Sequence, residues 1–433
     1  MAERSIGLCG IRSFSKVNIG FLSTRLAGVD GVSLETAKLR QVFEEMGHSC
    51  FYCAGELDQD GPPGQLVPEM HFTHPTAKAL HDEAFANPHP SPDLFKRIYA
   101  EADKIRADLE AFIEEHNIDL IVPQNANAIP MNLSLGVAIT DLVRRTRIKT
   151  LCHHHDFYWE RPRFINNGIQ DILDDAFPPA LDPIRHMVIS TPMQKRLRTW
   201  RGLRAFYLPN VFDFENPPAP PDAYAMSFRQ ELGLSADDLI VLQPTRVIRR
   251  KVIEKAIELV RKLNDPRLIL LITGYEGDEP GGYGVWLREE AERAGIRYRF
   301  IADYVGAERG ISDGHRVYTL WDIYPHAHLV TYPSDYEGFG NALIETLYFR
   351  KPVVVHTYPV YLADIKPCGV QAVEYHYDLT SEVIAAVRRL IDDAALRHQM
   401  TDHNFEVAAQ HFSFAVLRKV LATALDSFDD NTF

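Results

Sequence analysis

Residues 332–347 read YPSDYEGFGNALIETL, and they join a predicted strand at His328–Tyr332 to a predicted helix at Ala342–Tyr348. An apolar run of strand length and apolar residues at helical spacing support these two elements. Glycine on both sides of Phe339, at Gly338 and Gly340, lets the backbone of the junction come close to a ligand. The first free N–H groups of a helix bind anions, so we expect a diphosphate over four backbone positions: Gly340, Asn341, Ala342 and Leu343.

Two carboxylates flank this junction. Glu337 leaves the loop just before the helix, and Glu345 falls on the second helical turn. Side chains placed in this way can hold hydroxyl groups at opposite ends of one extended ligand. The alternative interpretation is two surface carboxylates on an ordinary loop and helix.

A second motif, PTRVIRRKVIEKAIEL, follows a predicted strand at Leu239–Gln243. It places Arg246 and Lys251 between that strand and the next helix. Arginine offers a fork that matches phosphate oxygens, and lysine offers a compact charge. Cations fixed in advance would stabilise the negative charge that a leaving diphosphate gains in the transition state. A merely solvated basic helix start is disfavoured, because it opposes the helix dipole.

Strand-like and helix-like segments alternate outward from these motifs through both halves of the chain, which predicts an α/β protein of parallel βαβ units. Strands are expected at 17–22, 49–53, 118–122, 149–152, 186–189, 239–243, 268–272, 299–302, 328–332 and 353–356. Helices are expected at 32–46, 94–116, 131–145, 253–263, 342–348, 381–391 and 415–428. The Pro-rich stretch 210–225 is predicted to be a domain connector, and 58–91 a long loop or small insertion.

Bulk composition limits the functions that are possible. A chain of 433 residues predicts two domains, and 46% hydrophobic with 24% charged residues is typical of a soluble globular protein. The net charge of −13 argues against nucleic acid and anionic lipid as main partners. No transmembrane run or signal-peptide layout is present in the sequence. The five cysteines are an odd number and, apart from Cys50 and Cys53, widely spaced, which indicates a reducing compartment, so we expect a cytoplasmic protein.

The two motifs together resemble the family-4 retaining glycosyltransferases, whose mark is a Glu, seven residues and a second Glu around a Gly-Phe-Gly turn. Glu337 and Glu345 match that spacing, and Arg246 and Lys251 match a family Arg and Lys five residues apart. The resemblance implies that Glu337 contacts the transferred sugar, that Glu345 contacts the ribose, and that the two cations contact the donor diphosphate.

The same resemblance implies the GT-B fold, an α/β architecture in which two Rossmann-like doubly wound domains face a central cleft. Residues 1–212, with a C-terminal helix at about 412–433, would bind the acceptor, and residues 213–411 would bind the nucleotide sugar. This chain departs from the family pattern in two places. Thr245 replaces a usual Gly and Arg250 stands where Glu is frequent, so the separate roles of Arg249 and Arg250 stay open.

The N-terminal half carries two weaker matches. In TLCHHHDFYWERPRF, residues 150–164, His155–Asp156 fits a family His that is often followed by Asp and lies close to the sugar, with His153 and His154 as alternatives. A metal site on His153 and His155 is the competing interpretation, and we expect no metal. Asp156, Trp159 and Arg163 are weak candidates for the acceptor side. The turn after the first strand carries Gly31 where the family has a Gly-rich, donor-facing turn; a plain turn and helix cap is the alternative.

The implied function is metal-independent transfer of a hexose, with retention, from a GDP- or UDP-linked sugar to a small soluble acceptor. The expected catalytic residues are Arg246, Lys251, Glu337 and His155, and no cofactor is expected beyond the nucleotide sugar as co-substrate. A glycerate-type precursor of a compatible solute is the leading acceptor, on a similarity to bacterial family-4 proteins. The alternatives are a nucleotide-sugar 2-epimerase and a non-catalytic nucleotide-sugar-binding protein. A homodimer is possible.

Overall fold

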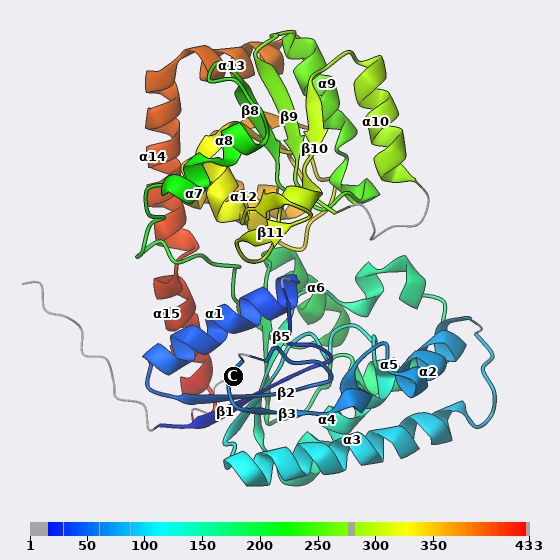
Figure 1. The fold of residues 1–433 in the computed structure, drawn as a ribbon. Coiled ribbons are helices and arrows are strands. Elements are labelled where there is room, and N and C mark those ends of the chain that lie inside the picture. Colours follow the sequence, from blue (N-terminus) through cyan, green and yellow to red (C-terminus); the bar gives the residue numbers. More distant parts are fainter. Residues whose placement is uncertain (1–15, 29, 60, 87, 276–281, 430–433) are drawn as a thin grey trace, which may run out of the picture. The chain divides into compact units, whose positions relative to one another are not determined.

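The computed structural model describes residues 16–429 apart from 29, 60, 87 and 276–281. Figure 1 traces the chain through two compact units. Of the described residues, one unit comprises those up to Ala27 with Thr36–His153 and Phe157–Arg185, and the other comprises Gly28–Glu35, His154–Asp156 and those from His186 onward.

The N-terminal sheet has seven strands in the order β3-β2-β1-β4-β5-β6-β7. The strands are β1 (Asn18–Ser23), β2 (Ser49–Ala54), β3 (Gly64–Leu66), β4 (Leu120–Pro123), β5 (Lys149–His154), β6 (Ile184–Val188) and β7 (Phe206–Tyr207). The helices are α1 (Gly31–Glu45), α2 (Pro75–Ala86), α3 (Leu94–His116), α4 (Leu133–Thr146), α5 (Gln170–Ala176) and α6 (Thr191–Arg201). The strand pairings that join β1 to β2 and β4 are parallel, as the alternating pattern predicts.

Helix α3 shows how the apolar pattern sets the packing in this half. Its buried side chains recur every three or four residues: Leu94, Ile98, Ala102, Ile105, Leu109 and Phe112. Phe112 lies so close to β1 that a Cβ added at Gly20 would come within 2.7 Å of its ring. The glycine therefore lets the helix settle on the sheet.

Of the two alternatives that the sequence leaves for residues 58–91, a long loop or a small insertion, the segment is not a long loop. The segment contains β3, a short 3-10 helix at Pro68–Met70 and the 12-residue helix α2. The Pro and His residues of the segment suggest a loop, but Pro75 is the first residue of α2, a position where proline is compatible with a helix. Ala77, Leu80 and Ala84 then bury one face of that helix.

The C-terminal sheet has six strands in the order β10-β9-β8-β13-β14-β15, and each strand pairs in parallel with its neighbours. The strands are β8 (Leu239–Gln243), β9 (Leu268–Ile272), β10 (Tyr298–Phe300), β13 (Ala327–Tyr332), β14 (Val353–His356) and β15 (Val373–Tyr375). The sequences LIVLQ, LILLI and VVVH of β8, β9 and β14 are almost wholly apolar and buried. Near-continuous apolar strands are typical of a parallel sheet with both faces covered.

Eight helices of the described residues accompany this sheet: α7 (Ala223–Met226), α8 (Phe228–Glu231), α9 (Glu254–Leu263), α10 (Tyr283–Arg293), α11 (Leu320–Ile323), α12 (Asn341–Tyr348), α13 (Ser381–Asp392) and α14 (Ala394–His411). The last helix, α15 (Phe414–Asp426), packs against β7 of the N-terminal sheet. Helix α9 packs against β9, α10 and α13, and α12 packs against β13 and α14 (Figure 1). A small antiparallel hairpin, β11 (Gly310–Ser312) and β12 (His315–Val317), is an addition that the sequence did not indicate. Among the residues that the structure describes, no helix is both long enough and apolar enough to cross a membrane.

Candidate functional site

The two C-terminal motifs lie at the same edge of one sheet. Strands β8 and β13 are direct neighbours, with Leu242 opposite Val330, so their carboxyl ends lie side by side. In open parallel sheets this edge is where ligands bind. The loops that follow it, which begin after Gln243 and Tyr332, carry the two predicted motifs.

A short polar chain at this edge accounts for the departure from glycine at Thr245. Thr331 Oγ1 donates a hydrogen bond to Gln243 Oε1 at 2.6 Å, and Gln243 Nε2 donates to Thr245 Oγ1 at 2.7 Å. All three side chains are buried, so each polar atom in the chain needs a partner. The Thr245 hydroxyl supplies the last acceptor.

Glu337 is the charged centre of the site. Its side chain is only 8% exposed, and it forms an ion pair with the equally buried Lys251 through Oε1. A second cation, Arg250, donates from Nη1 to Glu337 Oε2 at 2.8 Å. Lys251 and Arg250 both belong to the 3-10 helix Arg249–Lys251, which follows β8.

The charge state of Glu337 follows from these neighbours. Burial by itself would raise the pKa of its carboxyl group, but the positive charges of Lys251 and Arg250 outweigh that effect and hold the pKa below its usual range. Glu337 is therefore ionised at neutral pH. Arg246, the other predicted cation of this loop, is exposed.

The Gly338–Gly340 turn is fixed from the next strand. Tyr358, just after β14, donates its hydroxyl hydrogen bond to Phe339 O at 2.8 Å. Gly340 has φ +130°, and a Cβ at this position would come within 2.3 Å of the Tyr358 hydroxyl oxygen. Only glycine fits there. The Phe339 ring is buried against Phe412, so its side chain serves packing.

Helix α12 begins immediately after this turn, at Asn341. Asn341 Nδ2 donates to Glu35 Oε1 at 3.1 Å, and Asn341 Oδ1 accepts from Asn210. Sequence reasoning gave neither Glu35 nor Asn210 a role here, because both lie more than 100 residues away along the chain. The backbone of the first turn (Asn341, Ala342 and Leu343) is the predicted diphosphate position.

Glu345, on the second turn of α12, is half-buried and accepts a hydrogen bond from the Tyr324 hydroxyl at 2.9 Å. The Tyr324 ring is fully buried and stacks parallel on Phe349, with ring centres 4.7 Å apart. Burial, together with the charge of Glu345, holds the pKa of Tyr324 above its usual range, so the phenol stays a neutral donor. Tyr324 fixes Glu345, and no sequence signal marked it.

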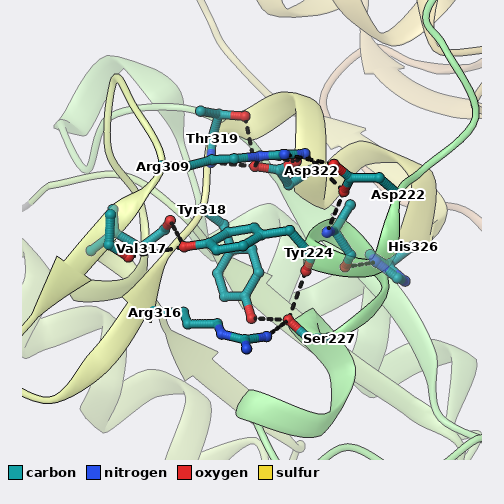
Figure 2. Close-up of polar contacts among 12 residues, drawn as sticks. Asp222, Tyr224, Ser227, Arg309, Arg316, Val317, Tyr318, Thr319, Asp322 and His326 are labelled. Atoms are coloured by element: carbon teal, nitrogen blue, oxygen red, sulfur yellow. Dashed lines mark hydrogen bonds and ion pairs between the residues drawn. The ribbon is translucent and has the colours of Figure 1, made fainter.

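Tyr324 is itself held through α11 by the polar network of Figure 2. Arg309 donates to both carboxylate oxygens of Asp222, at 2.7 and 3.0 Å, and to the buried Asp322. Asp322 in turn accepts from the N–H and hydroxyl of Thr319, which caps α11. This network joins the hairpin β11–β12 to the helix that precedes Tyr324.

The three consecutive histidines have different environments. His153 is buried, and its Nδ1 pairs with Gln124 Oε1 at 2.9 Å. His154 is also buried, and its Nε2 pairs with His186 Nδ1 at 2.9 Å. His155 is partly exposed, and its carbonyl oxygen would be 3.3 Å from a Cβ added at Gly338. Of the three, only His155 lies beside the Gly338 turn; Asp156, next to it, is buried.

The predicted metal alternative, His153 with His155, is not the group that the fold assembles. Among the described residues, one set of three potential ligands has atoms within 4.8 Å of one another, and it consists of Cys152, His154 and His186. All three are buried, and the two histidines are already hydrogen-bonded to each other. That bond gives both imidazoles a partner without an ion.

The remaining predicted residues lie as follows. Gly31 is the first residue of α1, with open space around it, and Asp30 caps the helix by accepting from Val32 N at 2.9 Å. Trp159 stacks on Phe157 with ring centres 4.5 Å apart. Arg163 lies over the Phe164 ring at 4.6 Å. Trp159 and Arg163 therefore have structural contacts of their own.

Comparison with known proteins defines the class. Residues 226–406 match the family described as glycosyl transferases group 1. A mannosylglucosylglycerate synthase of Petrotoga mobilis is 32% identical to this chain, over 82% of this chain and 86% of its own length. The chain therefore belongs to the group 1 glycosyltransferase family, as the motifs around Glu337 and Arg246 predicted.

Further matches agree with this assignment. A mannosylglucosylglycerate synthase of Thermotoga maritima is 30% identical, over 94% of this chain and 99% of its own length. A glycosyltransferase of Rickettsia africae has a TM-score of 0.69 at 13% identity, covering 97% of this chain and 100% of its own. A sucrose-phosphate synthase of Thermosynechococcus elongatus has a TM-score of 0.66 at 17% identity, covering 95% and 99%. These structures confirm the predicted fold class, two Rossmann-like domains of the GT-B type.

Proposed function

We propose that the protein transfers a mannosyl group, with retention of anomeric configuration, from a nucleotide sugar to a glucosylglycerate-type acceptor. The part of this proposal that concerns the nucleotide-sugar donor is supported by the buried Lys251–Glu337 ion pair, which lies just before the first turn of α12 in the chain. The acceptor and the sugar come from the names of the two relatives, which are synthases of mannosylglucosylglycerate.

In this proposal the diphosphate of the donor lies over the first turn of α12, where backbone N–H groups and the helix dipole favour an anion. Arg246 and Lys251 neutralise the charge that develops as the nucleoside diphosphate leaves. Glu337 accepts hydroxyl hydrogens of the sugar, Glu345 those of the ribose, and His155 lies near the transferred sugar. Residues 213–411 form the donor-binding part, and residues 1–212 present the acceptor.

The proposed chemistry needs no protein nucleophile. The acceptor hydroxyl attacks the anomeric carbon on the face from which the diphosphate departs, and its proton passes to the departing phosphate oxygen. The bond from the anomeric carbon to the diphosphate oxygen breaks, and the bond to the acceptor oxygen forms. The products are the new glycoside and a free nucleoside diphosphate, without a metal or a further cofactor.

The test is an acceptor assay with GDP-mannose and UDP-glucose as donors, run in EDTA. Glucosylglycerate is compared with glucosylglycerol, which has the same sugar but no carboxylate. We expect nucleoside diphosphate release with glucosylglycerate, and NMR of the product should give the same anomeric configuration as the donor sugar. An inverted product would overturn retention, and activity only with added divalent metal would overturn metal independence.

A reaction with the donor alone distinguishes the proposed transferase from the alternative enzyme. A nucleotide-sugar 2-epimerase would hydrolyse or epimerise the donor in the absence of any acceptor, whereas a transferase should leave it almost unchanged. Donor binding without product for any acceptor would indicate a binding protein instead.

A further inference from the structure

Arg250 has a place in the site that the motif spacing did not assign. Its Nη1 donates to Glu337 Oε2 and to Tyr336 O, both at 2.8 Å. Its own carbonyl oxygen accepts from Asp335 N at 3.0 Å. Arg250 is therefore joined by three hydrogen bonds to the turn that ends in Glu337.

The carboxylate of Glu337 has one cation for each oxygen. Lys251 occupies Oε1 and Arg250 occupies Oε2, so the three groups carry charges of +1, +1 and −1, a net +1. A buried carboxylate must be paired, but a single cation already satisfies that need. The second cation means that one of the two can leave Glu337 without stranding a buried negative charge.

Lys251 and Arg250 differ in how readily each can leave the Glu337 carboxylate. Lys251 is 9% exposed, and its compact ammonium can turn from a carboxylate to a phosphate oxygen. Arg250 is 39% exposed, and its Nη1 donates both to Glu337 Oε2 and to Tyr336 O, so it is fixed to the backbone of the turn as well as to the carboxylate. Arginine also stays charged across the whole working pH range.

We propose that Arg250 is a positioning residue that keeps Glu337 ionised and in place while Lys251 engages the anionic donor. This inference rests on the proposed function, because it requires a diphosphate at the first turn of α12. It assigns a role to a position where this chain differs from the pattern it resembles.

The experiment compares Arg250→Gln and Arg250→Lys with the wild type and with Arg249→Gln as the matched control. Arg249 lies on the same 3-10 helix, and its guanidinium is over the Tyr283 ring at 5.4 Å. GDP and UDP are titrated by calorimetry at pH 6 to 8 in buffers of different ionisation enthalpy, which measures proton uptake on binding. Thermal unfolding of each variant checks that it is folded.

In Arg250→Gln, a diphosphate that takes Lys251 leaves Glu337 without a cation, so the carboxylate must take up a proton. We expect proton uptake beyond that of the wild type, and affinity at least about tenfold weaker above pH 7, where that proton is scarce. Arg250→Lys should recover most of both quantities, and Arg249→Gln should match the wild type.

Equal proton uptake and equal affinity in wild type and Arg250→Gln would overturn the role of Arg250 while leaving the proposed function intact. Failure of the wild type to bind either nucleotide would overturn both. If Arg250→Gln does not fold, Arg250→Lys decides: unchanged binding and proton uptake support the charge role, and a loss as large as that in a folded Lys251→Met variant overturns it.

Discussion

At the scale of single residues, the site is a set of charges and close contacts that each depend on one or two neighbouring side chains. Glu337 is ionised because two cations lie on it, and the turn beside it closes because Gly340 has no side chain. Both features can be removed one residue at a time, with a measurable result.

Replacing Lys251 by Met should lower kcat by about 10²- to 10³-fold, because the preformed cation expected on the leaving diphosphate is lost. The measurement is nucleoside diphosphate release at saturating donor. Lys255→Met is the control, since Lys255 pairs with Glu258 on α9, where both side chains are 26% exposed. Unchanged turnover in Lys251→Met would contradict the assigned role.

Replacing Gly340 by Ala should destabilise the fold and abolish nucleotide binding. The positive φ alone costs about 1–3 kcal/mol, and the new Cβ overlaps the Tyr358 hydroxyl. Gly233→Ala separates the two causes, because Gly233 also has a positive φ (+57°) but open space around it. Denaturant unfolding should show a much larger loss for Gly340→Ala than for Gly233→Ala, and equal losses would show that the overlap is relieved.

Residue types and spacing were enough to select Glu337, Lys251 and Gly340, since each belongs to a local pattern. They could not select Tyr324, Tyr358 or Glu35, because these side chains reach the site from other elements. Spacing also left three histidines equivalent, and only burial separates His155 from the other two.

At the scale of elements, the long regular segments were predictable and the short or polar ones were not. The 23 residues of α3 carry an uninterrupted apolar stripe, and its predicted bounds agree with the structure. The strands of β11–β12 have three residues each, too few for a periodicity. Helix α14 buries the polar residues Thr401 and Asn404 beside Phe405 and Ala408. Its buried face therefore lacks the apolar periodicity from which a helix is predicted.

The network around Arg309 predicts a local effect. Arg309→Met would leave the buried Asp322 without its cation, so α11 should loosen and the midpoint of thermal unfolding should fall. Hydrogen exchange should quicken in residues 319–326. Asp322→Asn in the same chain should restore part of the loss, whereas Arg267→Gln, at an exposed pair with Asp265, should change little.

The pairing of β8 with β13 predicts a pH dependence. His328 Nδ1 accepts from Ile240 N at 3.1 Å, and burial, with the charges of Arg229 and Lys351 acting in the same direction, lowers the pKa of His328 to about 4. The unfolded chain binds a proton near the ordinary value of 6.5, so stability is full above that pH and falls as the pH drops towards 4.

Denaturant unfolding at pH 7 and pH 5 tests this expectation. His328→Asn keeps an acceptor for Ile240 N but does not titrate, so its unfolding free energy should fall less on acidification than that of the wild type. His398→Asn, at an exposed position, should keep the wild-type dependence. The same fall in wild type and His328→Asn would assign the pH dependence to other groups.

At the scale of the whole molecule, the alternation of strands and helices predicted an α/β protein of parallel βαβ units, and the family resemblance implied the GT-B class, which the structural relatives confirm. Two sheets of parallel strands follow from apolar runs separated by helix-length segments. The resemblance led to a glycerate-type acceptor, in agreement with the names of the two relatives, but no spacing in the sequence identifies the residues that would contact it. The domain limits and the possible homodimer stay predictions.

Donor binding should stabilise the whole molecule. A nucleotide sugar at 100 times its dissociation constant adds about 2.7 kcal/mol to the free energy of unfolding. A thermal-shift panel of UDP-, GDP- and ADP-sugars in EDTA should therefore give a selective rise for one base. A shift that requires a divalent metal would instead direct attention to Cys152, His154 and His186.

The contact between Gly340 and Tyr358 also constrains how this family can change over time. The tyrosine hydroxyl fills the space that a side chain at position 340 would need, and it holds the turn by its bond to Phe339. Neither residue can be exchanged alone without loss, so the two positions should covary among descendants of this chain. A lineage that loses the tyrosine gains room at the turn but must find another donor for the Phe339 carbonyl.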